Sequence, residues 1–200
     1  ELARRRRNLA KAGVLALDPD YGYRAYRVIT NGDRPAEEIC CLVDRFCHVA
    51  HLSAMARYGL TDRRPAALHL STPHRRVLRS LLDAAAARDY GETTLAELDD
   101  DQIVWPHGVT HPTTVRDRKL AVFHTAYPGE AMPVRGTHAR IATIGQTFAD
   151  MLEEPDACGG MAHVLEVWAE HAEVYLEDII AAVERSPRVI TKIRAGYILD

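Results

Sequence analysis

The stretch ELARRRRNLAKAGVLALDPDYGYRAYRVIT, residues 1–30, predicts a basic helix followed by a β-hairpin. At 3.6 residues per turn, the helix has an apolar side, which we expect to pack against the protein, and a cationic side opposite to it. The apolar side consists of Leu2, Ala3, Leu9, Ala10 and Ala12. The cationic side consists of Arg4, Arg7, Asn8 and Lys11. We expect the helix to end at Gly13, because a glycine readily adopts the positive φ that closes a helix.

The hairpin follows directly, with strands predicted at 14–18 and 23–29 and a Pro-Asp-Tyr-Gly turn between them. Arg24 and Arg27 lie on its second strand. A basic helix followed by a hairpin is typical of the recognition helix and wing of a winged helix-turn-helix domain, in which the helix enters the major groove and basic side chains contact phosphates. The predicted DNA-binding residues are therefore Arg4, Arg7, Asn8, Lys11, Arg24 and Arg27.

An ordinary solvated helix would also explain the basic residues of 1–11. A winged helix needs further helices before its recognition helix, and the sequence shows none before Glu1. We therefore expect residues 1–30 to be the back half of such a module, formed by the recognition helix and the wing.

Composition indicates a soluble globular protein, since 47% of residues are apolar and 26% are charged. The net charge of −3 conceals an asymmetry: residues 1–30 carry seven Arg or Lys against three acids, so residues 31–200 carry −7. Only the N-terminal end is expected to attract polyanions. There is no apolar run of membrane-spanning length and no signal-peptide core, so we expect a cytoplasmic protein with no membrane contact.

The loop TNGDRP, Thr30 to Pro35, is the expected border between the partial winged helix (1–30) and a second domain (31–200). In the second domain we expect a small mixed sheet in the middle and a run of helices at the end, which gives an α+β fold. Helices are predicted at 36–46, 51–58, 75–88, 146–153, 160–172, 176–184 and 188–197, and strands at 66–71, 115–127 and 140–144. Residues 90–114 are expected to be mostly irregular.

Two groups of potential metal ligands stand close together in the sequence, and we expect neither to bind a metal. His107 and His111 have helical spacing, but Gly108 and the flanking prolines disfavour the helix that such a pair needs. Cys47, His48 and His51 lack a second cluster that would complete a four-ligand site. The four cysteines form no disulfide or CxxC pattern and are expected to be buried thiols. No metal and no cofactor is predicted.

An enzymatic function has weak support. The acidic residues at 97 and 99–101 are most simply a solvated loop, and Asp117-x-Lys119, on a predicted strand, is half of a restriction-type nuclease signature. Nucleophile-elbow, phosphate-loop and dinucleotide-binding motifs are absent from the sequence. We therefore predict no catalytic residues, and a metal-dependent nuclease remains the less favoured alternative.

Two further segments resemble the AbiEi-type antitoxins of type IV toxin-antitoxin systems. They are AHLSAMARYGLTDRRPAALHLSTP (50–73) and IATIGQTFADMLEEPDACGGMAHVLEVWAE (141–170), the second followed by TKIRAGYILD (191–200). The shared features are a Ser-Ala helix closed by Gly-Leu, a helix-opening T-x-x-x-T-x-x-D-x-L phrase, a Cys-Gly-Gly break and a late Gly-Tyr-Ile-Leu. Residues 75–114 depart from the family by being longer and less regular.

The resemblance implies an N-terminal winged helix and a C-terminal α/β antitoxin domain. It further implies a transcriptional autorepressor that binds its own promoter DNA, with repeats, and counteracts a nucleotidyltransferase toxin. The shared motifs are structural: Gly59 and Gly159-Gly160 as helix breaks, and Thr147, Phe148 and Leu152 as a buried helix face. A winged-helix regulator whose C-terminal domain senses a small molecule is the alternative function.

Overall fold

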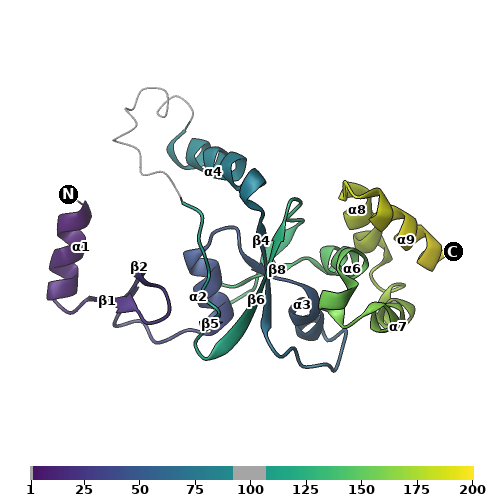
Figure 1. Cartoon of the computed structure of the whole chain (residues 1–200), viewed down its shortest axis with the longest axis horizontal. Coiled ribbons are helices and arrows are strands. Elements are labelled where there is room, and N and C mark those ends of the chain that lie inside the picture. The colour runs from purple at the N-terminus through teal and green to yellow at the C-terminus, as the bar shows by residue number, and fades with distance from the viewer. Residues whose placement is uncertain (1, 92–106) are drawn as a thin grey trace.

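The computed structural model describes residues 2–91 and 107–200 and has the predicted α+β architecture (Figure 1). A basic helix and a two-stranded hairpin lie at one end, a six-stranded mixed sheet lies in the middle, and the C-terminal helices lie at the other end. The N-terminal elements are α1 (Leu2–Lys11), β1 (Leu15–Asp18) and β2 (Gly22–Val28). None of the helices in these two ranges is long and apolar enough to span a membrane.

The hairpin forms as predicted, with Leu15 opposite Val28 and an irregularity in the register between Leu17 and Asp18. Gly13 has a φ of +70° and follows the last turn of α1. The expectation that the apolar side of α1 packs is wrong, because Ala3, Leu9, Ala10 and Ala12 are all exposed and Leu9 retains 44% of its accessible surface.

The central sheet has the strand order β5-β6-β4-β3-β8-β7. Its strands are β3 (His48–Val49), β4 (Leu68–Pro73), β5 (Thr114–Val115), β6 (Arg118–Thr125), β7 (Ala131–Pro133) and β8 (Arg140–Ala142). β4 is parallel to β6 and β3 is parallel to β8, whereas the remaining neighbours are antiparallel. The predicted mixed sheet is thus confirmed, but the short strands β3 and β7 were not predicted, and the stretch 115–127, predicted as one strand, is divided between β5 and β6.

Helices lie on both sides of this sheet. In Figure 1, α2 (Ala36–Val43) lies on one side and α3 (His51–Tyr58) on the other. In α2, Cys40 and Cys41 are buried beside Ile39, whereas Leu42 is exposed. The helix also ends before Phe46, since the Asp44 carboxylate accepts the backbone N–H of Phe46 (2.9 Å) and turns the chain.

Helix α4 (Arg75–Tyr90) leaves the sheet directly after β4. Nδ1 of His74 accepts the backbone N–H of Arg76 (3.2 Å) and caps the first turn. The returning loop passes close to this helix, because a Cβ on Gly108 would lie 2.5 Å from a methyl carbon of Leu78. Residues 107–113 carry no helix or strand, as predicted for this part of the chain.

The C-terminal part is helical as predicted: α6 (Ile144–Glu153), the short η1 (Pro155–Cys158), α7 (Met161–His171), α8 (Leu176–Arg185) and α9 (Val189–Leu199). The Thr143 hydroxyl accepts the backbone N–H of Gln146 (3.3 Å) and caps α6. Gly145 allows close packing, since a Cβ there would lie 2.1 Å from the carbonyl oxygen of Asp178 in α8.

A hydrophobic core joins these helices to α3. The predicted buried face of Thr147, Phe148 and Leu152 is confirmed, since all three are fully buried. Phe148 meets Trp168 of α7 edge to face, with ring centroids 5.4 Å apart. The predicted breaks are also confirmed: Gly59 ends α3 with a φ of +72°, and Gly159 and Gly160 separate η1 from α7.

Candidate nucleic-acid interface

Helix α1 presents basic side chains to solvent. Every residue from Ala3 to Lys11 is exposed, so the predicted DNA-binding residues Arg4, Arg7, Asn8 and Lys11 are all accessible. The first turn has no acidic residue, and Lys11 lies in the last turn, where a cation interacts favourably with the helix dipole. This ten-residue cationic helix projects from residues 31–200, the body of the protein (Figure 1), and has the shape and charge to enter a major groove.

The hairpin carries the other two predicted residues. Arg27 is exposed on β2. Arg24 is also exposed, but its guanidinium donates to the carbonyl oxygen of Thr110 (3.2 Å), so it is partly engaged with the body. The guanidinium of Arg6 lies 5.0 Å from the ring centroid of Tyr26, which connects α1 to the hairpin. The six predicted residues therefore belong to one connected helix-and-hairpin unit.

Tyr21, in the hairpin turn, attaches this unit to the rest of the protein. Its side chain is buried against α2, where its hydroxyl donates to Sγ of Cys40 (3.4 Å). The same hydroxyl lies 2.7 Å from Nδ1 of His111. The pKa of Tyr21 is raised above its usual range by burial and by the contact with Cys40. The hairpin is thus docked on the body through an interior contact.

Arg116 makes a second attachment, on the outer side of the turn. Its guanidinium forms ion pairs with Asp18 (2.6 Å), Asp33 (2.8 Å) and Asp20. Burial opposes ionisation of Asp18, but the hydrogen bond from Arg116, the backbone N–H groups of Tyr21 and Asp20 and the charge of Arg116 together outweigh it and lower the pKa of the Asp18 carboxyl. The hydrogen bond to Asp18 is the main reason that the pKa of Arg116 is raised. The orientation of the hairpin therefore depends on one arginine that pairs with three carboxylates.

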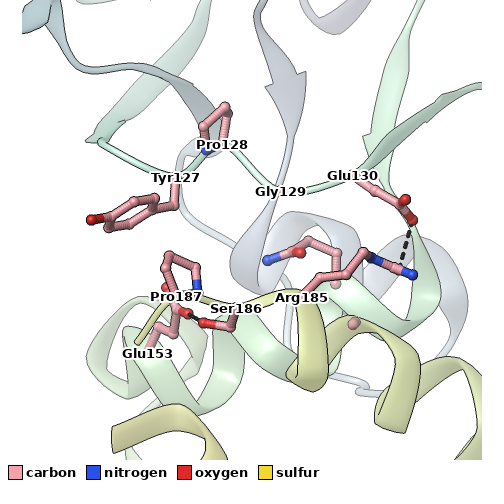
Figure 2. Close-up of a pocket in the computed structure, with 10 residues that line it drawn as sticks. Tyr127, Pro128, Gly129, Glu130, Glu153, Arg185, Ser186 and Pro187 are labelled. Atoms are coloured by element: carbon pink, nitrogen blue, oxygen red, sulfur yellow. Dashed lines mark hydrogen bonds and ion pairs between the residues drawn. The ribbon is translucent and has the colours of Figure 1, made fainter. Parts of the chain in front are cut away.

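A pocket lies at the opposite end of the molecule, between the loop after β6 and the end of α8. It has a volume of about 340 Å³. Figure 2 shows residues 127–130 on one wall and Glu153, Arg185, Ser186 and Pro187 on the other. Glu130 and Arg185 form an ion pair across it (2.8 Å). Gly129 is required here, because it has a φ of +62° and a Cβ would lie 2.3 Å from the Gln146 side chain.

A smaller polar pocket of about 110 Å³ adjoins the first and shares Tyr127, Pro128 and Glu153 with it. His51, which lines it, has a φ of +50° at the start of α3, a strained conformation for a residue other than glycine. Nδ1 of His51 is buried with no hydrogen-bond partner among the described residues, and burial lowers the pKa of His51 to about 4. Burial raises the pKa of Asp150, on the same pocket, to about 7. Strained and electrostatically perturbed groups of this kind are frequent at ligand sites.

The structure does not keep together the two groups of potential metal ligands that lie close in the sequence. Cys47 and His111, which come from two separate groups, lie together with Asp44. His51 instead packs against Phe123 with the rings tilted by 44° and their centroids 4.3 Å apart. His107 and His111 lie on irregular chain, so the helix that would pair them does not form. The four cysteines are free and buried, as predicted.

The residues considered for a nuclease are not assembled in the described ranges. Asp117 lies in the tight turn between β5 and β6 with a φ of +59°, so its predicted place on a strand is wrong. Asp117 and Lys119 are both exposed. The acidic residues at 97 and 99–101 lie outside the described residues.

The chain matches no protein-family model, and no curated protein is significantly similar to it. The AbiEi-type resemblance therefore rests on the quoted sequence segments alone.

Proposed function

We propose that the protein is an AbiEi-type antitoxin that represses its own operon in the cytoplasm by binding promoter DNA through α1 and the hairpin. The observation that carries the proposal is the exposed basic helix followed by a docked hairpin. In this arrangement α1 lies in the major groove, and Arg4, Arg7 and Lys11 contact phosphates or base edges. Arg24 and Arg27 contact the backbone beside the groove.

Docking of the hairpin supports this role. A wing is useful for recognition only if its orientation relative to the body is fixed, and Tyr21 and Arg116 hold this hairpin from two sides. The charge distribution supports it too, because the positive charge is concentrated in residues 1–30 while residues 31–200 are acidic. An acidic body is repelled by phosphates, which directs DNA toward the N-terminal unit.

Residues 31–200 are proposed to counteract a nucleotidyltransferase toxin without catalytic residues of their own. The resemblance in 50–73 and 141–200 supports this role. The test is to coexpress the protein with the toxin encoded beside it and to score growth. Rescue of growth is expected, and no rescue at matched expression would contradict the antitoxin role.

DNA binding is tested by fluorescence anisotropy with two labelled duplexes, the promoter of the protein's own operon and a scrambled sequence of the same length and composition. The promoter is expected to bind more tightly by at least about a thousandfold, the usual lower margin of a specific site over non-specific DNA. Equal affinity for the two duplexes would contradict the autorepressor role.

A small-molecule-responsive regulator is the second candidate, and the pocket in Figure 2 favours it. The volume of about 340 Å³ is within the range of small-molecule sites. The two functions differ in one respect: the autorepressor binds its promoter at full affinity without a ligand, whereas the sensor needs a compound that changes promoter affinity. A metabolite library screened by thermal shift and then by anisotropy separates them.

A further inference from the structure

Three side chains of different chemistry converge beneath the hairpin: the carboxylate of Asp44, the thiol of Cys47 and the imidazole of His111. Their oxygen, sulfur and nitrogen atoms all lie within 4.8 Å of one another. Asp44 and Cys47 come from the turn between α2 and β3, and His111 comes from the loop before β5. Two chain segments 67 residues apart therefore meet at this point.

The cluster is buried. The side chains of His111 and Asp44 are 1% and 7% exposed, and Cys47 has no exposed surface. Imidazole, thiolate and carboxylate are the three donor types that bind zinc in proteins. A thiolate beside an imidazole disfavours magnesium and calcium, which prefer oxygen ligands. The donor set therefore selects a borderline transition metal, of which zinc is the usual one.

Both ring nitrogens of His111 face polar side chains. Nδ1 lies 2.7 Å from the hydroxyl oxygen of Tyr21, and Nε2 lies 3.3 Å from Oδ2 of Asp44. In the tautomer that is protonated at Nδ1, the ring donates to Tyr21, and the lone pair of Nε2 points toward the Asp44 carboxylate, which also accepts the hydroxyl of Thr72 (3.0 Å). A metal ion between Nε2 and Asp44 would take the place of the proton that otherwise joins them.

The ligands are held by neighbouring groups, as in known zinc sites. Tyr21 fixes the ring of His111, and the backbone N–H of Phe46 fixes the Asp44 carboxylate (2.9 Å). The guanidinium of Arg140 donates to the carbonyl oxygens of Asp44 (2.6 Å) and Cys47 (2.8 Å). The turn that carries two of the ligands is therefore rigid before any ion binds.

The charges and distances also fit a divalent ion. One carboxylate and one thiolate balance a charge of +2, so the occupied site is neutral, as a buried site should be. Donor atoms around tetrahedral zinc are separated by about 3.5 Å, so the cluster closes with side-chain shifts of about 1 Å. Three protein ligands leave the fourth position of the ion for a water molecule.

We propose that Asp44, Cys47 and His111 bind one zinc ion, which fastens the loop before β5 to the α2–β3 turn and, through Tyr21, supports the docked hairpin. The site uses none of the predicted DNA-binding residues, so zinc binding can be tested separately from the antitoxin role. Its effect is structural, since ligand binding to the folded state alone stabilises that state.

The test begins with the unsubstituted protein, stripped with a chelator and dialysed against micromolar Zn²⁺ or Co²⁺. Mass spectrometry of bound metal is expected to give one zinc ion per chain, and the Co²⁺ form is expected to show an intense thiolate-to-cobalt charge-transfer band. Zinc is also expected to raise the melting temperature. Absence of bound metal and of the charge-transfer band would overturn the proposal.

Three variants localise the ion. Cys47→Ser is expected to abolish the charge-transfer band, and His111→Ala and Asp44→Asn are expected to reduce zinc affinity by at least about tenfold. Cys158→Ser is the matched control, because Cys158 is equally buried but lies in the other hydrophobic core. Retained binding in all three variants, or equal loss in the control, would overturn the assignment. If Cys47→Ser fails to fold by circular dichroism, the band of the unsubstituted protein and the Asp44→Asn titration decide the question.

Discussion

The hydroxyl oxygen of Tyr21 lies 2.7 Å from Nδ1 of His111, which joins the hairpin turn to a loop 90 residues further along the chain. Tyr21 is buried, and its hydroxyl also reaches Cys40 of α2. The Tyr21 side chain therefore connects the proposed DNA-binding unit to α2 and to His111, a proposed metal ligand.

Tyr21→Phe is expected to lower the free energy of unfolding by about 1–2 kcal/mol. The ring stays buried, but His111 and Cys40 lose their shared hydroxyl partner, and an unpaired buried polar group costs about 1–3 kcal/mol. Urea denaturation measures the change. Tyr23→Phe is the control, because Tyr23 is largely exposed on the same hairpin. Equal stability of Tyr21→Phe and the unsubstituted protein would show that the hydroxyl does not dock the turn.

Arg116→Ala is expected to destabilise the protein by about 2–4 kcal/mol at neutral pH, because it leaves the buried carboxylate of Asp18 unpaired. The folded-state pKa of Asp18 is lowered, so this contribution is complete above the ordinary value of 3.8 and is lost as the pH falls through the folded-state pKa. The difference in the free energy of unfolding between Arg116→Ala and the unsubstituted protein should therefore decrease at acidic pH. Chemical denaturation at several pH values measures it.

The control for that experiment is Asp83→Ala, which breaks the exposed pair with Arg79 on α4. A pair of this kind contributes about 0.5 kcal/mol or less. If Arg116→Ala costs no more than Asp83→Ala, Arg116 does not anchor the hairpin.

Asp150→Asn is expected to stabilise the protein at pH 7 and above by up to about 4 kcal/mol, the equivalent of a shift of about three pKa units. The folded-state pKa of Asp150 is raised to about 7 from 3.8, so the folded state binds more protons and its stability falls as the pH rises between these values. The asparagine oxygen can still accept the Gln146 amide, which donates to Oδ1 of Asp150 (2.8 Å). The stability of the Asp150→Asn variant should lack this decrease with rising pH.

The stability of Asp150→Asn must be compared with that of the unsubstituted protein at each pH, because His51 also contributes to the pH dependence. Its pKa is lowered to about 4, so its contribution makes stability rise with pH over part of the same range. Only the difference between Asp150→Asn and the unsubstituted protein isolates the carboxyl group. A difference that is constant from pH 4 to pH 8 would contradict a raised pKa for Asp150.

The elements that sequence predicted well are those set by contiguous residues. α3 ends at Gly59 because glycine accepts the left-handed conformation there, and α6 begins after Thr143 because its hydroxyl caps the helix. The hairpin follows from its Pro-Asp-Tyr-Gly turn. Such signals lie within a few residues of the structure they cause.

Features set by distant partners were missed. β3 is two residues long and forms because β4 and β8 pair with it. Two residues are too few to show the alternating hydrophobic pattern that predicts a strand. The exposure of Leu42 on α2 is also set by a distant partner, because the opposite side of this helix meets the sheet. The Asp44–Cys47–His111 cluster combines parts of two rejected groups with an acid that neither contained. An Asp-x-x-Cys spacing was the only local signal for it.

The six predicted DNA-binding residues remain a prediction that affinity measurements must decide. The most direct test compares the salt dependence of promoter affinity for the unsubstituted protein and the triple variant Arg4→Ala, Arg7→Ala, Lys11→Ala. The control triple variant, Lys119→Ala, Arg135→Ala and Lys192→Ala, removes the same charge from exposed residues elsewhere.

Each phosphate contact contributes about 0.9 to the slope of log affinity against log salt. The α1 variant is expected to lose at least about tenfold in affinity, and its slope should fall by about 3, while the control variant keeps both values close to those of the unsubstituted protein. Unchanged affinity and slope in the α1 variant, or an equal loss in the control variant, would contradict the proposal that α1 binds the promoter.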